Sequence, residues 1–338
     1  MFSFTRPRRA FDHVNEGGGA ASPMPHARRP KIGLALSSGV ARGWSHIGVV
    51  QEFAAQGIHF DVIAGTSIGA VVGGCHAAGR LDAIENFARS LTKRSVLGLM
   101  DFSFSSVGLI GGGKLKGRLL EALGDRNIED LHTKFAAIAT ESGSGHEVWF
   151  TKGNMVEAIR ASYAMPGIFE PVNIGGRWLF DGAFVNPIPI TVCRALGADL
   201  VVAVQLNAEH SFRSTVISDP TAEVMAPVVS NLGGGSGLLN GLRGRADSVI
   251  RQFAKRDDGA PGMASAMVDV FNITQDRIAR SRLAGDPPDF SISCKLGKIG
   301  LFDFHRADEM IAIGRETAKK AMPELREQFG LTEVKVGA

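Results

Sequence analysis

Residues 61–74 read DVIAGTSIGAVVGG, and this stretch decides the fold that the sequence predicts. Its first half is apolar and predicts a short buried strand, whereas its second half, rich in Ala, Gly and Val, predicts a helix. The corner between them is Gly-x-Ser-x-Gly, a pattern that holds the serine hydroxyl out of a strained strand-to-helix turn. Gly65 and Gly69 flank Ser67, where larger side chains would collide with a neighbouring strand or helix. The stretch predicts Ser67 as a nucleophile; the structural alternative is a tight turn with a serine cap.

A second loop precedes this corner. Residues 31–36 predict a strand, residues 37–43 (SSGVARG) a loop, and residues 44–56 a helix. A loop of this kind gathers backbone N–H groups into an anion site. It lacks the Gly-Lys-Ser/Thr ending of a phosphate loop and the three spaced glycines of a dinucleotide fingerprint. Because it should lie beside Ser67 at the carboxyl ends of adjacent parallel strands, an oxyanion site is favoured over a plain turn.

Asp181 is the candidate base. It follows the apolar residues 178–180 and precedes Gly182, so a tight turn would orient its carboxylate, although aspartate is common in turns without any catalytic role. A triad in the chain order Ser, Asp, His would use His210 or His305, the two histidines that follow. The residues leave open a triad with His305 and a dyad in which Asp181 takes the serine proton directly.

The rest of the chain indicates the fold and the domain limits around these motifs. Alternating strands and helices up to residue 206 predict a mostly parallel sheet covered on both faces, with a core over residues 30–207. Residues 263–330 are expected to complete this domain, with a helix at 263–283, a strand at 289–294 and a last helix at 306–329 interrupted at Pro323. Residues 1–29 predict a disordered basic tail, and residues 101–117 a loop. For the irregular insertion at 208–262, a membrane-surface segment, a lid and an insertion without a role stay open.

Composition narrows the class of protein. A hydrophobic fraction of 44% with 21% charged residues fits a chain with a sizeable core, and the net charge of +3 gives no reason to expect a nucleic-acid partner. No apolar run approaches the ~20 residues that span a bilayer, and the first thirty residues contain no secretory signal. The three cysteines (Cys75, Cys193 and Cys294) have no metal-ligand spacing and fit a reducing compartment. We expect a cytoplasmic protein, peripheral at most on the inner face of the membrane.

Four blocks, in order, resemble the patatin-like phospholipase family, and most closely its bacterial RssA-type branch. They are LSSGVARGWSHIG (36–48), GTSIG (65–69), RASYAMPGIF (160–169) and DGA (181–183). Their order and spacing match over about residues 31–207. The last predicted helix, preceded by DFHRA at 303–307, is also similar to that branch.

The resemblance implies a three-layer α/β/α sandwich and a Ser-Asp dyad of Ser67 and Asp181 that works without a metal or cofactor. It implies a phospholipid or another acyl-ester lipid as substrate, cleaved through an acyl-enzyme, with peripheral membrane contact. The remaining site residues that it implies are an oxyanion hole around Gly39, Val40 and Ala41, shaped by Arg42 and Gly43, an elbow at Gly65 and Gly69, and the Gly182 and Ala183 of the Asp-Gly-Ala motif. His46, which matches a helix histidine of the family, is interpreted as structural.

Two departures from the family pattern matter. Val40 stands where a glycine is usual, and a β-branched residue resists a positive φ angle. Ala183 replaces a second glycine, which is a milder change. The first hypothesis is a serine lipid acyl hydrolase of the phospholipase or lysophospholipase type. The alternatives are a weakly active or non-catalytic regulatory or scaffold protein on the same fold, which Val40 supports, and a triad esterase that uses His305.

Overall fold

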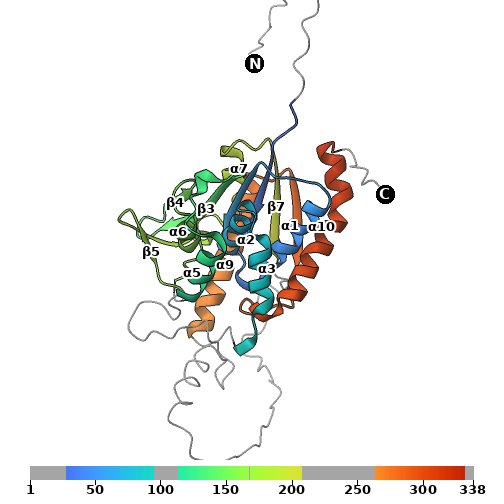
Figure 1. Cartoon of the computed structure of the whole chain (residues 1–338). Helices are drawn as coiled ribbons and strands as arrows, with labels where there is room; N and C mark the ends of the chain where they lie inside the picture. Colours follow the sequence, from blue (N-terminus) through green and yellow to red (C-terminus); the bar gives the residue numbers. More distant parts are fainter. Residues whose placement is uncertain (1–27, 95–112, 167, 208–262, 332–338) are drawn as a thin grey trace, which may run out of the picture. The chain divides into compact units, whose positions relative to one another are not determined.

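The computed structural model describes residues 28–94, 113–166, 168–207 and 263–331, which build a central sheet between helices (Figure 1). The strands are β1 (Ile32–Leu36), β2 (Val62–Thr66), β3 (Lys134–Glu141), β4 (Glu147–Phe150), β5 (Val172–Ile174), β6 (Arg177–Asp181), β7 (Leu200–Asn207) and β8 (Phe290–Lys295). The α-helices are α1 (Ser45–Ala55), α2 (Ile68–Ala77), α3 (Leu81–Ser90), α5 (Gly113–Leu123), α6 (Met155–Ser162), α7 (Ile190–Ala195), α9 (Met263–Gly285) and α10 (Ala307–Phe329). Short 3₁₀ turns lie at η1 (Val40–Trp44), η2 (Ile128–Asp130), η3 (Gly182–Phe184) and η4 (Phe304–Arg306).

The sheet has the order β5-β6-β3-β2-β1-β7-β8, and β4 pairs with β3 beside that path. The five strands β3, β2, β1, β7 and β8 run parallel, whereas β4 and β6 each pair antiparallel with β3, and β5 pairs antiparallel with β6. Every residue of β1 and β2 is buried, as expected for central parallel strands that helices cover on both faces. The edge strand β8 instead alternates buried and exposed residues, because only one of its faces meets the core.

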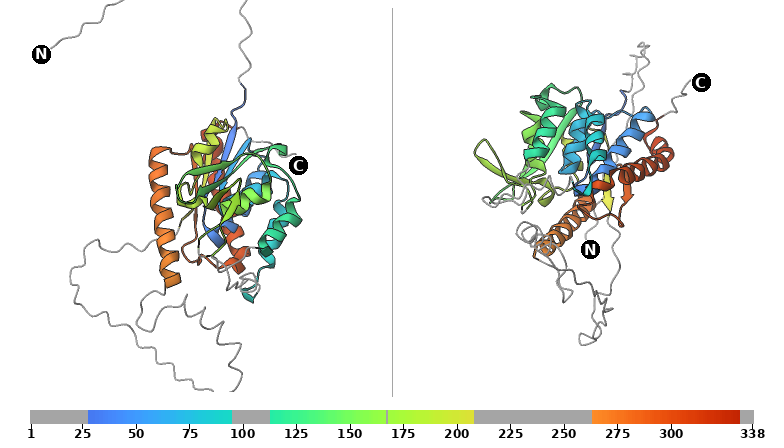
Figure 2. Two further views of the ribbon diagram at one scale, coloured as in Figure 1. Left: turned by 90° about the vertical axis from the view of Figure 1, so that its left-hand side faces the viewer. Right: turned by 60° about the horizontal axis from the view of Figure 1, so that its bottom comes forward.

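Alternate residues of the central strands belong to two hydrophobic cores, one on each face of the sheet. Leu34 and Leu36 pack with residues of α1, α2, α6 and α10, whereas Ala35 and Ala64 pack with α7 and with residues of α9 on the other face. In the left view of Figure 2, α9 (orange) stands on one side of the sheet, apart from the blue and green helices of the other layer. The predicted three-layer α/β/α sandwich with a mostly parallel sheet is confirmed.

Helices α1 and α10, neighbours in Figure 1, pack at backbone contact. A Cβ atom placed on Gly314 would lie under 3.0 Å from the carbonyl oxygen of Ser45, and one on Gly48 would come equally close to that of Ile311. These two glycines let the last helix, which is far from α1 in sequence, seal the apolar face of the sheet.

Two predicted elements differ in the structure. Residues 113–117, expected to belong to a loop, are the start of α5. The last helix runs through Pro323 without the expected break. Pro323 and Lys319, the residue whose carbonyl loses its helical partner, are both exposed, so water can solvate that carbonyl. Meanwhile Met322 and Leu325 anchor the opposite side of the helix in the core.

The predicted domain limits stay predictions, and the calls for residues 1–27 and 208–262 lie outside the described residues. Within the described ranges, none of the helices combines the length and apolar character that a membrane span requires.

Replacing Gly314 by Ala is expected to destabilise the protein by roughly 1–3 kcal/mol, because its Cβ would force α10 away from α1. The measurement is guanidinium unfolding followed by circular dichroism. Gly117→Ala is the matched control, because a Cβ at that helical position meets nothing within 4 Å. It should leave stability unchanged or raise it by up to about 1 kcal/mol. Equal effects of the two substitutions would contradict the close packing of α1 and α10.

Candidate active site

Ser67 stands at the corner between β2 and α2 in a strained conformation. Its φ is 58° and its ψ is −122°, outside the usual range of a residue with a side chain. Its backbone N–H donates to the Oγ atom of Ser162 in α6, at 2.9 Å. Gly65 and Gly69 hold the corner closed, since a Cβ on Gly65 would lie under 3.0 Å from the Gly69 carbonyl oxygen. A Cβ on Gly69 would clash in the same way with the carbonyl oxygen of Leu36.

The hydroxyl of Ser67 meets the carboxyl of Asp181. Ser67 Oγ donates to Asp181 Oδ2 at 2.6 Å, and the backbone N–H of Ala183 donates to Asp181 Oδ1 at 2.9 Å. The sheet explains this meeting, because β3 lies between β2 and β6: Thr66 pairs with Ile138, and the next residue, Ala139, pairs with Asp181. The two side chains thus come from the strands on either side of β3, at one level of the sheet.

The turn after Asp181 is tight. A Cβ on Gly182 would lie under 3.0 Å from the carbonyl oxygen of Ile138, so this position has no room for a side chain. Ala183 is fully buried, and the methyl group that replaces the usual glycine hydrogen packs with Met165, Ile168 and Phe271. The departure at Ala183 is therefore accommodated by the surrounding core.

The carboxyl of Asp181 is completely buried, and burial raises its pKa from the ordinary 3.8 to about 7. The hydrogen bonds from Ser67 and from the Ala183 N–H oppose this shift, because both stabilise the ionised form. A carboxyl with a pKa near 7 is a far better proton acceptor than an ordinary aspartate while still being ionised in part at neutral pH.

The 37–43 loop lies against the start of α2. A Cβ on Gly43 would lie under 3.0 Å from the side chain of Ile68, the residue that follows Ser67. The N–H of Ala41 donates to the carbonyl of Leu301 at 3.0 Å, and that of Arg42 to the carbonyl of Gly39 at 3.2 Å. Among the described residues, the N–H groups of Gly39 and Val40 have no acceptor. These two groups are therefore the ones left for an anion.

Val40 adopts the conformation that a glycine would favour. Its φ is 53°, in the left-handed region where a β-branched residue is strained. The valine therefore occupies a backbone conformation that a glycine adopts without strain. The side chain packs against the apolar cluster of Met165, Ile168, Ala183 and Phe271, so apolar contact accompanies the strain.

Helix α9 reaches this site from the other layer. Ser38 Oγ donates to Gln275 Oε1, and the rings of Phe184 and Phe271 meet edge to face with centroids 4.9 Å apart. Gln275 and Ser162 were not singled out from the sequence. The signal that could have found them is a polar residue on the buried face of an otherwise apolar pattern.

Among the described residues, no histidine forms a hydrogen bond with Ser67 or Asp181. His46 is fully buried, its Nε2 lies 2.8 Å from the carbonyl oxygen of Ser37, and burial lowers its pKa to about 4, so the imidazole is neutral. His305 lies in η4, and His210 lies outside the described residues. A triad needs an imidazole between the serine and the aspartate, whereas here the two side chains bond directly. In the part of the chain that the structure describes, no cluster of His, Cys, Asp or Glu could hold a metal ion.

Comparisons with known proteins identify the family of this chain. The family model described as patatin-like phospholipase matches residues 34–194. An uncharacterized NTE family protein of Mycobacterium bovis is 35% identical over an alignment that covers 89% of this chain and 95% of the relative. The chain belongs to the patatin-like phospholipase family. The RssA-type branch within that family stays a prediction.

A second relative and a solved structure are less similar to this chain. A lysophospholipase, nte1 of Emericella nidulans, is 28% identical over 52% of this chain, and the match spans only 12% of that longer protein. The crystal structure of VipD from Legionella pneumophila resembles this structure with a TM-score of 0.44 at 13% identity, covering 88% of this chain and 67% of that one.

The buried carboxyl makes stability depend on pH. Between pH 3.8 and about 7 the unfolded chain has Asp181 ionised while the folded protein holds the proton, so wild-type stability falls as pH rises through this window. Asp181→Asn cannot ionise and escapes this loss. We expect the free energy of unfolding of Asp181→Asn, measured by urea unfolding, to rise relative to that of the wild type from pH 5 to about pH 7 and then to level off. A difference that stays constant with pH would contradict the raised pKa.

Proposed function

We propose that this protein hydrolyses acyl esters of lipids, of the phospholipase or lysophospholipase type, with Ser67 as nucleophile and Asp181 as base. Family membership gives the reaction class, a lipid ester hydrolase. The observation that supports the dyad is the 2.6 Å hydrogen bond from Ser67 Oγ to Asp181 Oδ2, because a nucleophile and its base must lie within hydrogen-bond reach.

In the first step Ser67 Oγ attacks the ester carbonyl carbon while its proton passes to Asp181 Oδ2. The carbonyl oxygen becomes an oxyanion, which the N–H groups of Gly39 and Val40 stabilise. The tetrahedral intermediate then collapses to an acyl-enzyme, and the alcohol leaves with the proton held by Asp181.

In the second step Asp181, again a carboxylate, takes a proton from a water molecule that attacks the acyl carbon. Collapse of this second intermediate breaks the bond to Ser67 Oγ, which regains its proton, and releases the fatty acid. Ala183 contributes by holding Oδ1, which leaves Oδ2 directed at the serine. Gly182 and the elbow glycines contribute shape alone.

Two alternatives differ from this proposal in testable ways. A triad esterase would need His305 as base, and the direct contact between Ser67 and Asp181 argues against it. A non-catalytic scaffold protein on this fold has the strained Val40 as its support. The left-handed conformation of Val40 favours catalysis instead, since the N–H groups of Gly39 and Val40 have no acceptor among the described residues.

Ser67→Ala and Asp181→Asn are each expected to lower kcat for 4-nitrophenyl butyrate and for a lysophospholipid by at least about 10³-fold. Ser67→Ala should also abolish labelling by a fluorophosphonate, which reacts with activated serines. His305→Ala serves as the control and should stay within about twofold of the wild type. Loss of turnover in His305→Ala would support the triad, and labelling that survives Ser67→Ala would exclude Ser67 as nucleophile.

The raised pKa of Asp181 also sets the pH dependence of the rate. As the base must be ionised, kcat/KM is expected to rise with pH through about 7 and then to level. His46 has its pKa lowered to about 4 and is neutral across this range, so it adds no second limb there. The measurement is a pH–rate profile on a substrate without ionisable groups. A profile that is flat from pH 5 to pH 9 would argue against Asp181 as the base.

A further inference from the structure

The 298–303 turn, between β8 and η4, holds the 37–43 loop in place. The carbonyl of Leu301 accepts the N–H of Ala41 at 3.0 Å, and the carbonyl of Ile299 accepts Arg42 Nε at 2.9 Å. The rings of Phe304 and Trp44 add an edge-to-face contact with centroids 6.1 Å apart. The residues directly after Gly39 and Val40 are thus tied to a segment more than 250 positions later in the chain.

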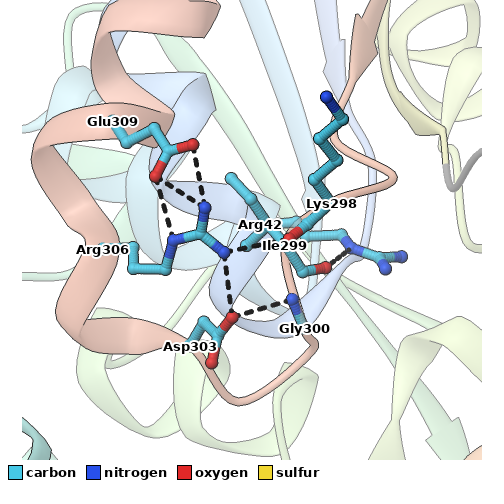
Figure 3. A network of polar contacts seen from close by, with 7 residues as sticks. All are labelled: Arg42, Lys298, Ile299, Gly300, Asp303, Arg306 and Glu309. Atoms are coloured by element: carbon cyan, nitrogen blue, oxygen red, sulfur yellow. Dashed lines mark hydrogen bonds and ion pairs between the residues drawn. The ribbon is translucent and has the colours of Figure 1, made fainter.

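Arg306 closes this turn (Figure 3). Its Nη1 donates to the carbonyl of Lys298 at 2.9 Å and to Asp303 Oδ2 at 3.2 Å, and that carboxylate oxygen also accepts the N–H of Gly300 at 2.9 Å. On its other side the guanidinium binds both carboxylate oxygens of Glu309, each at 2.9 Å. A bidentate contact of this kind fixes the orientation of the arginine plane.

The side chains of Arg306 and Asp303 are about one-third exposed, so the ion pair itself adds little to the free energy of folding. Its effect is geometric. It fixes the turn, and the turn places the carbonyl oxygens of Leu301 and Ile299 against Ala41 and Arg42. Those contacts occupy the Ala41 N–H and hold the strained Val40 in the conformation that leaves its own N–H free of described acceptors.

We propose that Arg306 and Asp303 are positioning residues for the oxyanion hole of Gly39 and Val40. This inference rests on the proposed function, since it concerns how that hydrolase stabilises its oxyanion. Displacing a preorganised donor by a fraction of its hydrogen-bond length is enough to weaken transition-state stabilisation, because the donors must fit the oxyanion rather than the ground state.

The test compares an ester with its thiono analogue, in which sulfur replaces the carbonyl oxygen. Sulfur is larger and accepts hydrogen bonds poorly, so an intact oxyanion hole favours the oxygen ester. Arg306→Ala is expected to lower kcat for the oxygen ester about tenfold with KM within about twofold, and to lower the oxygen-to-sulfur rate ratio by several fold. Arg306→Lys, which keeps the cation, should recover part of both. The ratio does not depend on the fraction of folded enzyme, so a purely structural role would not move it.

Asp308→Ala is the matched control: Asp308 lies at the same helix start but pairs with Arg89 of α3, and its loss should leave rate and ratio unchanged. Asp303→Asn is isosteric and keeps an acceptor for Gly300, so it should fold and lower the ratio to a smaller extent. An unchanged ratio in both Arg306→Ala and Asp303→Asn, with Ser67→Ala inactive, would overturn the positioning role and leave the hydrolase standing. Turnover that survives Ser67→Ala would overturn the proposed function and this inference with it.

Discussion

The hydrogen bond between the hydroxyl of Ser67 and the carboxyl of Asp181 is the interaction on which the site depends. It joins residues from two strands that are not neighbours, and the register of β3 between them, where Ile138 pairs with Thr66 and Ala139 with Asp181, brings the two side chains to one level. It also places an ionisable group where water does not reach, which raises the pKa of Asp181 to about 7. In our proposal the buried position of Asp181 therefore accounts for two requirements of the reaction: the carboxyl lies within hydrogen-bond reach of Ser67, and its raised pKa makes it a better base.

The strained backbone conformations of the described residues lie in the loops around this contact. Of the described residues other than glycine, only Ser67 and Val40 have a positive φ, and they belong to the two loops that border the pair. Conformations of this kind cost of order 1–3 kcal/mol each and persist where the surroundings over-determine them. The surroundings here are specific: Ser162 binds the Ser67 N–H, the elbow glycines admit close backbone contact, and Leu301 binds the residue after Val40. Such a distribution fits a preorganised site better than a scaffold free of catalytic constraint.

The sequence predicted what is encoded locally. The strand-corner-helix around Ser67, the loop before it and the turn at Asp181 each combine a short apolar run with glycine at the point of close approach, so their form can be read directly. Partners far apart in sequence could not be read in this way. A polar residue on a buried face could point to Ser162 and Gln275, but the sequence does not show which groups they bind. That they and the carbonyl of Leu301 accept hydrogen bonds from the two active-site loops depends on which helices and turns the sheet brings together. The helix break expected at Pro323 was wrong for a related reason. The packing of α10 against the core outweighs the loss of a single helical hydrogen bond.

These distant partners change what counts as the active site. The stretch that matches the patatin-like family model ends at residue 194, yet the 37–43 loop is bound by Gln275 of α9 and by the carbonyls of Ile299 and Leu301. Ser67 and Asp181, the nucleophile and base of our proposal, lie inside the matched stretch, whereas these groups that bind the 37–43 loop lie beyond it. Because a preorganised donor is effective only while its support is rigid, the C-terminal elements belong to the catalytic apparatus of our proposal as much as the Gly-x-Ser-x-Gly corner does. A chain shortened to the matched stretch would keep both reacting side chains and lose the contacts that hold Val40 in its strained form.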